Sequence, residues 1–290
     1  MFGRTIVIII LLLGSSLPGP AQTPVMLGVL EQVSTSRSQA PAQAVRVLFQ
    51  SDGEDWRALA TDCPDYDCSR PLTARSDREA TWTISSEGRS LGQVKSRIPA
   101  EFDMHAALGR QMLISQPSTP ALRNAHYGGS DEPAFRPLVA TSRSHVSDPD
   151  EWKPSSVSSD VAKAVRKAFR DSYSQVHRCD TNQPLAYRDS DVAVAGAYAS
   201  KFSWHLVEVT LEGCAGSEDG DKNLRSQWFA VNGANQAELV GEDIELVGSG
   251  DYDNDGSSEL VFAVTRENRN GYELFYDDFR GHVTLTYSMP

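Results

Sequence analysis

The stretch GSGDYDNDGSSELVF, from Gly248 to Phe262, places three aspartates on alternate positions, then a glycine, then an acid three residues later. The segment IELVGSG that leads into it and the segment ELVFAV that leaves it are rich in the apolar residues typical of β-strands. The glycines at the end of the first segment mark the place where that strand stops. The stretch therefore predicts an acidic loop between two neighbouring strands.

The spacing of the acids in this loop predicts a calcium site. With Asp251 as the first position, Asp253, Asp255 and Glu259 stand at the third, fifth and ninth. Ca²⁺ takes roughly six to eight oxygen ligands, and alternate carboxylates on a curling backbone can supply several of them. Gly256 permits the tight turn that exposes the backbone carbonyl of Ser257 as a further ligand. Without a cation the crowded carboxylates repel one another. The alternative is an acidic, solvated turn that holds no ion tightly.

The loop differs from an EF-hand and is similar to another family of calcium loops. An EF-hand needs an entering helix and an acid at the twelfth position, which is Phe262 in this chain. The pattern D-x-D-x-D-G-x-x-[D/E] between strands resembles the calcium loops of FG-GAP and VCBS-type repeats, as in integrin-like β-propellers. The resemblance covers about residues 244–277, and it suggests a single such repeat in an exported bacterial-type protein. The resemblance implies a metal site whose calcium ligands are Asp251, Asp253, Asp255, Ser257 through its carbonyl, and Glu259. Only one copy of the repeat is present, so we expect it within a smaller sheet and not in a closed propeller.

The C-terminal part of the chain, residues 158–290, predicts one helix and an antiparallel sheet. DVAKAVRKAFRDSYSQV places Val161, Val165, Ala168, Phe169 and Val176 on one stripe, and Ser158 or Ser159 can cap it. The segments after it favour strands joined by short turns rich in Gly, Asn and Asp. The expected strands are Val192–Ser200, Trp204–Leu211, Gln227–Val231, Ile244–Gly248, Leu260–Thr265, Tyr272–Tyr276 and Val283–Tyr287.

The N-terminal part, residues 22–115, predicts a small β module. Its first residues, to about Ala44, have an irregular composition. AVRVLFQ and WRALA around Gly53, and ATWTIS and LGQVKSR around Gly88, read as two hairpins. Residues 116–157 contain six prolines and predict a linker or a long surface excursion. The expected fold is thus mostly β with one covering helix: a small β module followed by an α+β antiparallel-sheet domain.

The first residues predict export. Arg4 precedes an apolar run from Ile6 to Leu13, and Gly19 and Ala21 are small residues suited to signal-peptide cleavage after residue 21. We therefore expect a secreted or periplasmic protein with no stable membrane insertion after cleavage. Removing residues 1–21 removes Arg4 as the only charged residue, which leaves 26 basic and 39 acidic side chains and a net charge of −13. This charge argues against nucleic acid as a partner.

The four cysteines, Cys63, Cys68, Cys179 and Cys214, predict two disulfides in an exported chain. All three connectivities are open, and proximity in the sequence favours Cys63–Cys68 and Cys179–Cys214. A redox pair or a metal site is the alternative, but the Cys-x4-Cys spacing is not the usual redox spacing.

No motif indicates catalysis. The chain has no G-x-S-x-G elbow and no paired-histidine zinc spacing, and its histidines are scattered singly; His105, near Asp103, and His205, in a predicted strand, carry no clear catalytic signal. We expect a calcium-stabilised binding or adhesion module that takes a protein or glycan ligand. The alternative is an extracytoplasmic hydrolase whose catalytic groups, such as a histidine and two carboxylates in a cleft, come together only in the fold.

Overall fold

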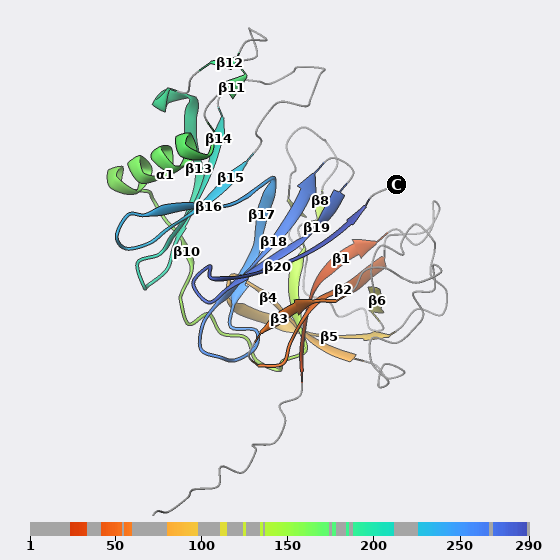
Figure 1. Cartoon of the computed structure of the whole chain (residues 1–290). Helices are drawn as coiled ribbons and strands as arrows, with labels where there is room; N and C mark the ends of the chain where they lie inside the picture. The colour runs from red at the N-terminus through yellow and green to blue at the C-terminus, as the bar shows by residue number, and fades with distance from the viewer. Residues whose placement is uncertain are drawn as a thin grey trace, which may run out of the picture.

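The computed structural model describes residues 24–33, 42–53, 55–59, 80–97, 111–114, 124–125, 134–135, 137–173, 176–177, 184–185, 188–211, 226–266 and 269–288. This part of the chain is mostly β and contains one α-helix. Its strands form three large antiparallel sheets and two small two-stranded ones (Figure 1). The large sheets of the described residues have seven, five and four strands, so they are not the similar blades of a closed propeller. The predicted mostly-β fold with one covering helix is confirmed. The predicted signal segment and all four cysteines lie outside the described residues.

The seven-stranded sheet contains the two hairpins that the sequence predicts. Its order is β1-β9-β4-β5-β6-β2-β3, and β1 also pairs with β2, so that the sheet curls round on itself. The β4–β5 hairpin turns at Glu87 and Gly88, which both have positive φ as a type I′ two-residue turn requires. The bounds are β1 Val25–Val33, β2 Ala42–Ser51, β3 Trp56–Ala58, β4 Ala80–Ser86, β5 Arg89–Arg97, β6 Gln111–Ile114 and β9 Leu138–Thr141.

The later strands form a five-stranded and a four-stranded sheet. The five-stranded sheet has the order β10-β13-β14-β15-β16, and the four-stranded sheet follows the chain from β17 to β20. Two small sheets pair β7 (Asn124–Ala125) with β8 (Ala134–Phe135) and β11 (Val176–His177) with β12 (Pro184–Leu185). The other bounds are β10 Lys153–Pro154, β13 Val192–Ala199, β14 His205–Leu211, β15 Gln227–Val231, β16 Ala237–Glu242, β17 Ile244–Gly250, β18 Glu259–Arg266, β19 Arg269–Tyr276 and β20 Gly281–Ser288.

The four-stranded sheet lies between the other two large sheets. Alternate side chains of its strands point to opposite faces. Val247, Val261 and Leu274 pack with the seven-stranded sheet, whereas Leu246 and Phe262 pack with the five-stranded sheet. The far face of the five-stranded sheet is covered by the helix. The layers are therefore the seven-stranded sheet, the four-stranded sheet, the five-stranded sheet and the helix (Figure 1).

The helix α1 (Ser159–Ser172) follows the predicted amphipathic stripe. Val161, Val165 and Phe169 are buried against the five-stranded sheet, and the Ser158 side chain accepts a hydrogen bond from the backbone of Val161 as the N-cap. The helix ends four residues before Val176, which belongs to β11 instead. The helix α1 is neither long nor apolar enough to cross a membrane, and the described residues contain no other helix that is.

Several strands were not predicted from the sequence, including β1, β9 and β16 and the short strands β6, β7, β8, β10, β11 and β12. Residues 25–33, expected to be irregular, form β1, which pairs with β2 and β9 and buries Leu27, Val29 and Leu30 fully in the core. Residues 138–141, within the expected linker, form β9, which pairs with β1 and β4 and has all four residues buried. The edge strand β16 was not expected because its AELVGE sequence is polar and half exposed.

Candidate metal centre

The acidic loop lies between the strands that the sequence predicts for it. It runs from Asp251 to Ser258, and the pairing of Gly250 with Glu259 closes its base. The backbone has positive φ at Asn254 (70°) and at Gly256 (93°). Asparagine and glycine are the residues that adopt this region most readily, which explains their place in a loop that turns so tightly.

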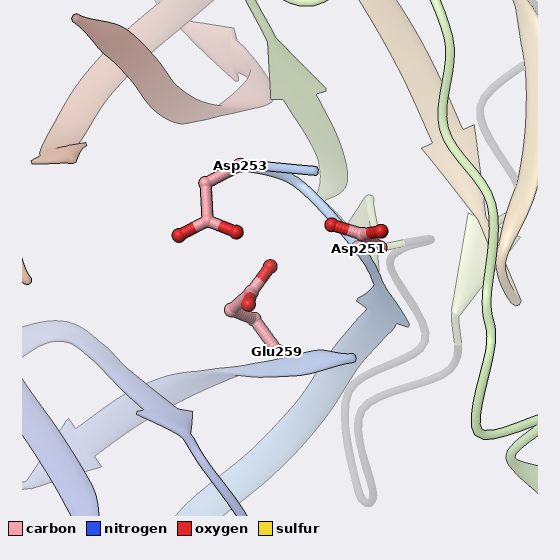
Figure 2. A group of neighbouring side chains, drawn as sticks. All are labelled: Asp251, Asp253 and Glu259. Atoms are coloured by element: carbon pink, nitrogen blue, oxygen red, sulfur yellow. The ribbon is translucent and has the colours of Figure 1, made fainter. Parts of the chain in front are cut away.

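Three of the five predicted ligands converge inside the loop. Asp251, Asp253 and Glu259 each offer a carboxylate oxygen, and these three oxygens lie within 4.8 Å of one another. Figure 2 shows Asp251 and Asp253 on the loop and Glu259 at the start of β18. All three side chains are buried, with 7%, 7% and 1% of their surface exposed.

Hydrogen bonds from the loop backbone hold the carboxylates in place. Asp251 accepts from the backbone N–H groups of Asn254 (2.6 Å), Asp255 (3.1 Å) and Gly256 (3.2 Å). Glu259 accepts from the N–H of Tyr252 at 2.6 Å. These bonds use part of the acceptor capacity of each carboxylate, since each oxygen carries two lone pairs.

Asp253 reaches the seven-stranded sheet. Its Oδ2 accepts a hydrogen bond from the Oγ of Ser51, at the end of β2, at 3.3 Å. Its backbone carbonyl accepts from the Arg143 guanidinium at 2.8 Å. The loop is thus tied to residues that precede it by more than a hundred positions.

Burial and mutual repulsion both act against the charged form of the three acids. Burial raises the pKa of Asp251, against the opposing hydrogen bonds of the loop backbone. Burial, followed by the charge of Asp255, raises the pKa of Asp253. Burial, followed by the charge of Asp253, raises the pKa of Glu259 well above its usual range. No Lys, Arg or His in the described part of the chain forms an ion pair with any of the three carboxylates.

The spacing of the carboxylates fits a single calcium ion. Two oxygens bound to one Ca²⁺ at about 2.3–2.6 Å lie at most about 5 Å apart, which accommodates the separations in this group. The group contains oxygen ligands only, which suits a hard cation such as Ca²⁺ and not the His and Cys ligands of zinc sites. The residues present therefore fit the ion that the sequence pattern implies.

The two other predicted ligands are placed differently. Asp255 is exposed, and its Oδ1 accepts a hydrogen bond from the backbone N–H of Ser257 at 2.7 Å. The side chain of Asp255 does not belong to the converging group of Asp251, Asp253 and Glu259, although its backbone N–H contacts two of those carboxylates. Ser257 is half-buried beside it. The structure thus brings three of the predicted carboxylates together and leaves the Asp255 side chain exposed, and the Ser257 carbonyl stays a predicted ligand.

A segment before α1 holds the loop from the other side. The backbone N–H of Asp251 donates to the carbonyl of Ser147 at 2.7 Å. The Ser258 hydroxyl donates to Asp148 Oδ1 at 2.6 Å, and the Ser258 N–H donates to Asp150 Oδ2 at 3.2 Å. Burial raises the pKa of Asp150, partly offset by the hydrogen bond from Ser258. The sequence pattern contains no signal for this segment, because its contacts are hydrogen bonds between residues far apart in the chain.

Tyr252, which sequence reasoning did not single out, anchors the loop. Its side chain is fully buried in the core between the seven-stranded and four-stranded sheets, beside Val139. A Cβ on Gly250 would lie 3.0 Å from the tyrosine ring, and a Cβ on Gly248 would lie 3.5 Å from its hydroxyl and 3.1 Å from Val139. The two glycines therefore make room for the ring. An aromatic residue between two aspartates, after a G-x-G sequence, was the available signal.

Among the described residues, no histidine lines the pocket between β13 and β17 or the one beside Trp152 and Phe279. His282 Nε2 lies 3.5 Å from Glu273 Oε2, and its ring stacks on Phe275. His205 lies on β14, as the sequence predicts for a sheet residue. His105 lies outside the described residues, and the hydrolase alternative stays a prediction.

Comparison with models of known families, with curated proteins and with solved structures finds no match for this chain.

Proposed function

We propose that this chain is an exported binding or adhesion module whose fold is stabilised by Ca²⁺ in the loop between β17 and β18. The observation that carries the proposal is the convergence of three buried carboxylates, Asp251, Asp253 and Glu259, within reach of one ion. A divalent cation would relieve the repulsion and the burial cost that raise the pKa of all three groups.

The position of the loop supports a stabilising role for the ion. The loop contacts the seven-stranded sheet through Ser51 and the segment before α1 through Ser147 and Asp150. An ion that fixes the loop would thereby fix the contact of three separate parts of the fold. Because the ion would bind the folded state and not the unfolded chain, its binding would add directly to the free energy of unfolding.

The surroundings of the loop are consistent with the resemblance to FG-GAP and VCBS-type repeats. The loop joins the first two strands of a four-stranded antiparallel sheet, which is the unit from which propeller blades are made. In this proposal the exposed Asp255 and the carbonyl of Ser257 complete the coordination, and water supplies the remaining oxygens. The predicted signal segment and the acidic composition support export, and a protein or glycan is the expected partner rather than nucleic acid.

Thermal unfolding of the mature chain in EGTA and in millimolar CaCl₂ tests the proposal. At a free concentration of about 100 times Kd, calcium adds about 2.7 kcal/mol to the free energy of unfolding. We expect a rise in Tm of several degrees, and a calorimetric titration with one site per chain. MgCl₂ in place of CaCl₂ reports the selectivity of the loop.

Two variants make the test specific. Asp253→Asn removes one converging carboxylate and should abolish the rise in Tm, whereas Glu238→Gln removes an exposed charge from the edge strand β16 and should leave it intact. Identical unfolding midpoints of the folded wild-type protein in EGTA and in calcium would overturn the proposal.

A further inference from the structure

One face of the five-stranded sheet is only partly covered. The helix α1 packs on the face that carries Val207 and Phe229, and the four-stranded sheet covers the opposite face around Leu206 and Trp228. Beside this second contact, the structure has a pocket of about 370 Å³, between β10, β13, β14 and β15 on one side and β17 on the other. This volume lies within the range of about 300–1,000 Å³ that is usual for small-molecule sites.

The pocket exists because a glycine stands where the pairing register shifts. Gly196 on β13 pairs with Glu208 on β14, and Glu208 pairs with Trp228 on β15, so these residues form one row across the sheet. A Cβ on Gly196 would lie 3.2 Å from Glu208 Oε2. The φ of Gly196 is not in the left-handed region, so a larger residue could take this position without backbone strain and would extend into the pocket.

The Glu208 carboxylate is held in a fixed orientation with one oxygen directed away from its protein partner. Oε1 accepts a hydrogen bond from the Ser226 hydroxyl at 2.7 Å. Oε2 lies on the side of Gly196, and nothing in the described part of the chain donates a hydrogen bond to it. On the opposite wall, the lining includes Glu245 and Leu246 of β17. The Ser155 hydroxyl, also in the lining, is buried and makes no hydrogen bond with any described residue.

Two aromatic rings complete the pocket. The centroids of Tyr198 and Trp228 lie 6.2 Å apart, with their planes at 33°. The Trp228 ring is fixed by its Nε1–H, which donates to the carbonyl of Ile244 at 2.8 Å. Aromatic faces and carboxylates both attract cations. The described residues that line the pocket with Glu208 include no Lys, Arg or His.

We propose that this pocket binds an organic cation, an ammonium or a guanidinium group, with Glu208 Oε2 as its main acceptor. The shared chemistry can come from a small free amine or from a Lys or Arg side chain of a partner. The inference rests on the proposed function in so far as it names the ligand class of a binding module, but it does not depend on the calcium loop.

Calorimetric titration of the calcium-loaded protein with three probes tests the ligand class. The probes are agmatine, which carries an ammonium and a guanidinium group, the capped tripeptide Gly-Arg-Gly, and glucose. We expect agmatine to bind with one site per chain and glucose not to bind. Tighter binding of the tripeptide than of agmatine would assign the site to a partner side chain, and the reverse would assign it to a free amine. Binding of glucose without agmatine, or of no probe at all, would overturn the proposal.

Variants on two walls of the pocket place the binding there. Glu208→Gln keeps an oxygen that can accept from Ser226 and removes the charge, so we expect a loss of affinity for agmatine of roughly tenfold or more. Gly196→Val fills the pocket from the neighbouring strand and should abolish binding, and the exposed control Glu238→Gln should not change it. Unchanged affinity in Glu208→Gln contradicts the proposal even if Gly196→Val does not fold. The rise in Tm with calcium, measured on the same variants, should persist, which separates this inference from the proposed calcium site.

Discussion

Two acidic turns lie at the same end of the four-stranded sheet. The first, Asp251–Ser258, joins β17 to β18, and the second, Asp277–Arg280, joins β19 to β20. The second turn keeps Asp277 and Asp278 exposed and pairs Asp277 with Arg280. The first turn buries three carboxylates together, and no cationic side chain of the described residues pairs with them. The sequence pattern distinguishes the two turns by the spacing of their acids, and the structure distinguishes them by burial.

The difference explains why we propose a cation for one acidic turn and not for the other. Exposed charges in water are screened and cost little, so the turn at Asp277 is satisfied by solvent and one arginine. Buried carboxylates lose their hydration and repel one another at close range, so a bound cation would stabilise the charged form of the turn at Asp251. An acidic composition alone is therefore a weak sign of a metal site, and acidic composition combined with burial is a stronger one.

The largest effect is expected from the aromatic residue that each turn contributes to the core. Tyr252→Ala should lower the free energy of unfolding by about 3–5 kcal/mol, because the ring is fully buried between two sheets and its loss leaves a cavity. Phe279→Ala in the second turn should cost roughly 1–2 kcal/mol, since Phe279 is only half-buried against Trp152 and Trp204. Urea unfolding measures both.

Tyr252→Phe is the control for this pair, because it keeps the ring and should stay within about 1.5 kcal/mol of the wild-type protein. Equal losses from Tyr252→Ala and Phe279→Ala would show that the first turn is no better anchored than the second.

A smaller effect of opposite sign is expected when a buried charge is removed. In EGTA, Glu259→Gln should raise the free energy of unfolding by about 1–3 kcal/mol, because it replaces an uncompensated buried carboxylate by a neutral group that can still accept from Tyr252. The same variant should lose the stabilisation by calcium. Asp278→Asn in the exposed turn should change the stability by no more than about 0.5 kcal/mol in either condition.

Denaturant unfolding of the wild type and both variants, in EGTA and in calcium, gives the change in the free energy of unfolding of each variant in each condition. A loss of stability of metal-free Glu259→Gln would mean that the charge of Glu259 is satisfied within the protein, and the contrast between the two turns would then fail.

Local patterns in the sequence predict the elements around the loop but not their partners. Segments rich in apolar residues locate β17 and β18, and the spacing of the acids includes the three carboxylates that converge, those of Asp251, Asp253 and Glu259. The contact of Asp253 with Ser51 joins residues 202 positions apart, and no local pattern contains it. Pairing between distant strands and side-chain burial depend on the whole fold, which is why the anchoring role of Tyr252 was missed.

The pocket beside Glu208 illustrates the same limit. Gly196, Glu208 and Trp228 lie on three separate predicted strands, and each is an ordinary residue in its own segment. Only the register of those strands places them in one row, since a shift of one residue would turn each side chain to the other face.

The smallest effect is expected from the arginine of the exposed turn. Arg280 donates from its guanidinium to the Asp277 carboxylate and, at 3.0 Å, to the Asp277 carbonyl, but both side chains are largely exposed. Arg280→Ala should therefore cost no more than about 0.5 kcal/mol, and high salt should reduce even that loss by screening the pair.

Arg143→Ala is the matched change beside the first turn, where a half-buried guanidinium donates to the Asp253 carbonyl at 2.8 Å. We expect it to cost about 1–2 kcal/mol with little dependence on salt, because its partner would be left buried without a donor. Urea unfolding at low and high NaCl measures both variants, and a salt-sensitive loss at Arg143 equal to that at Arg280 would mean that solvent reaches the two turns alike.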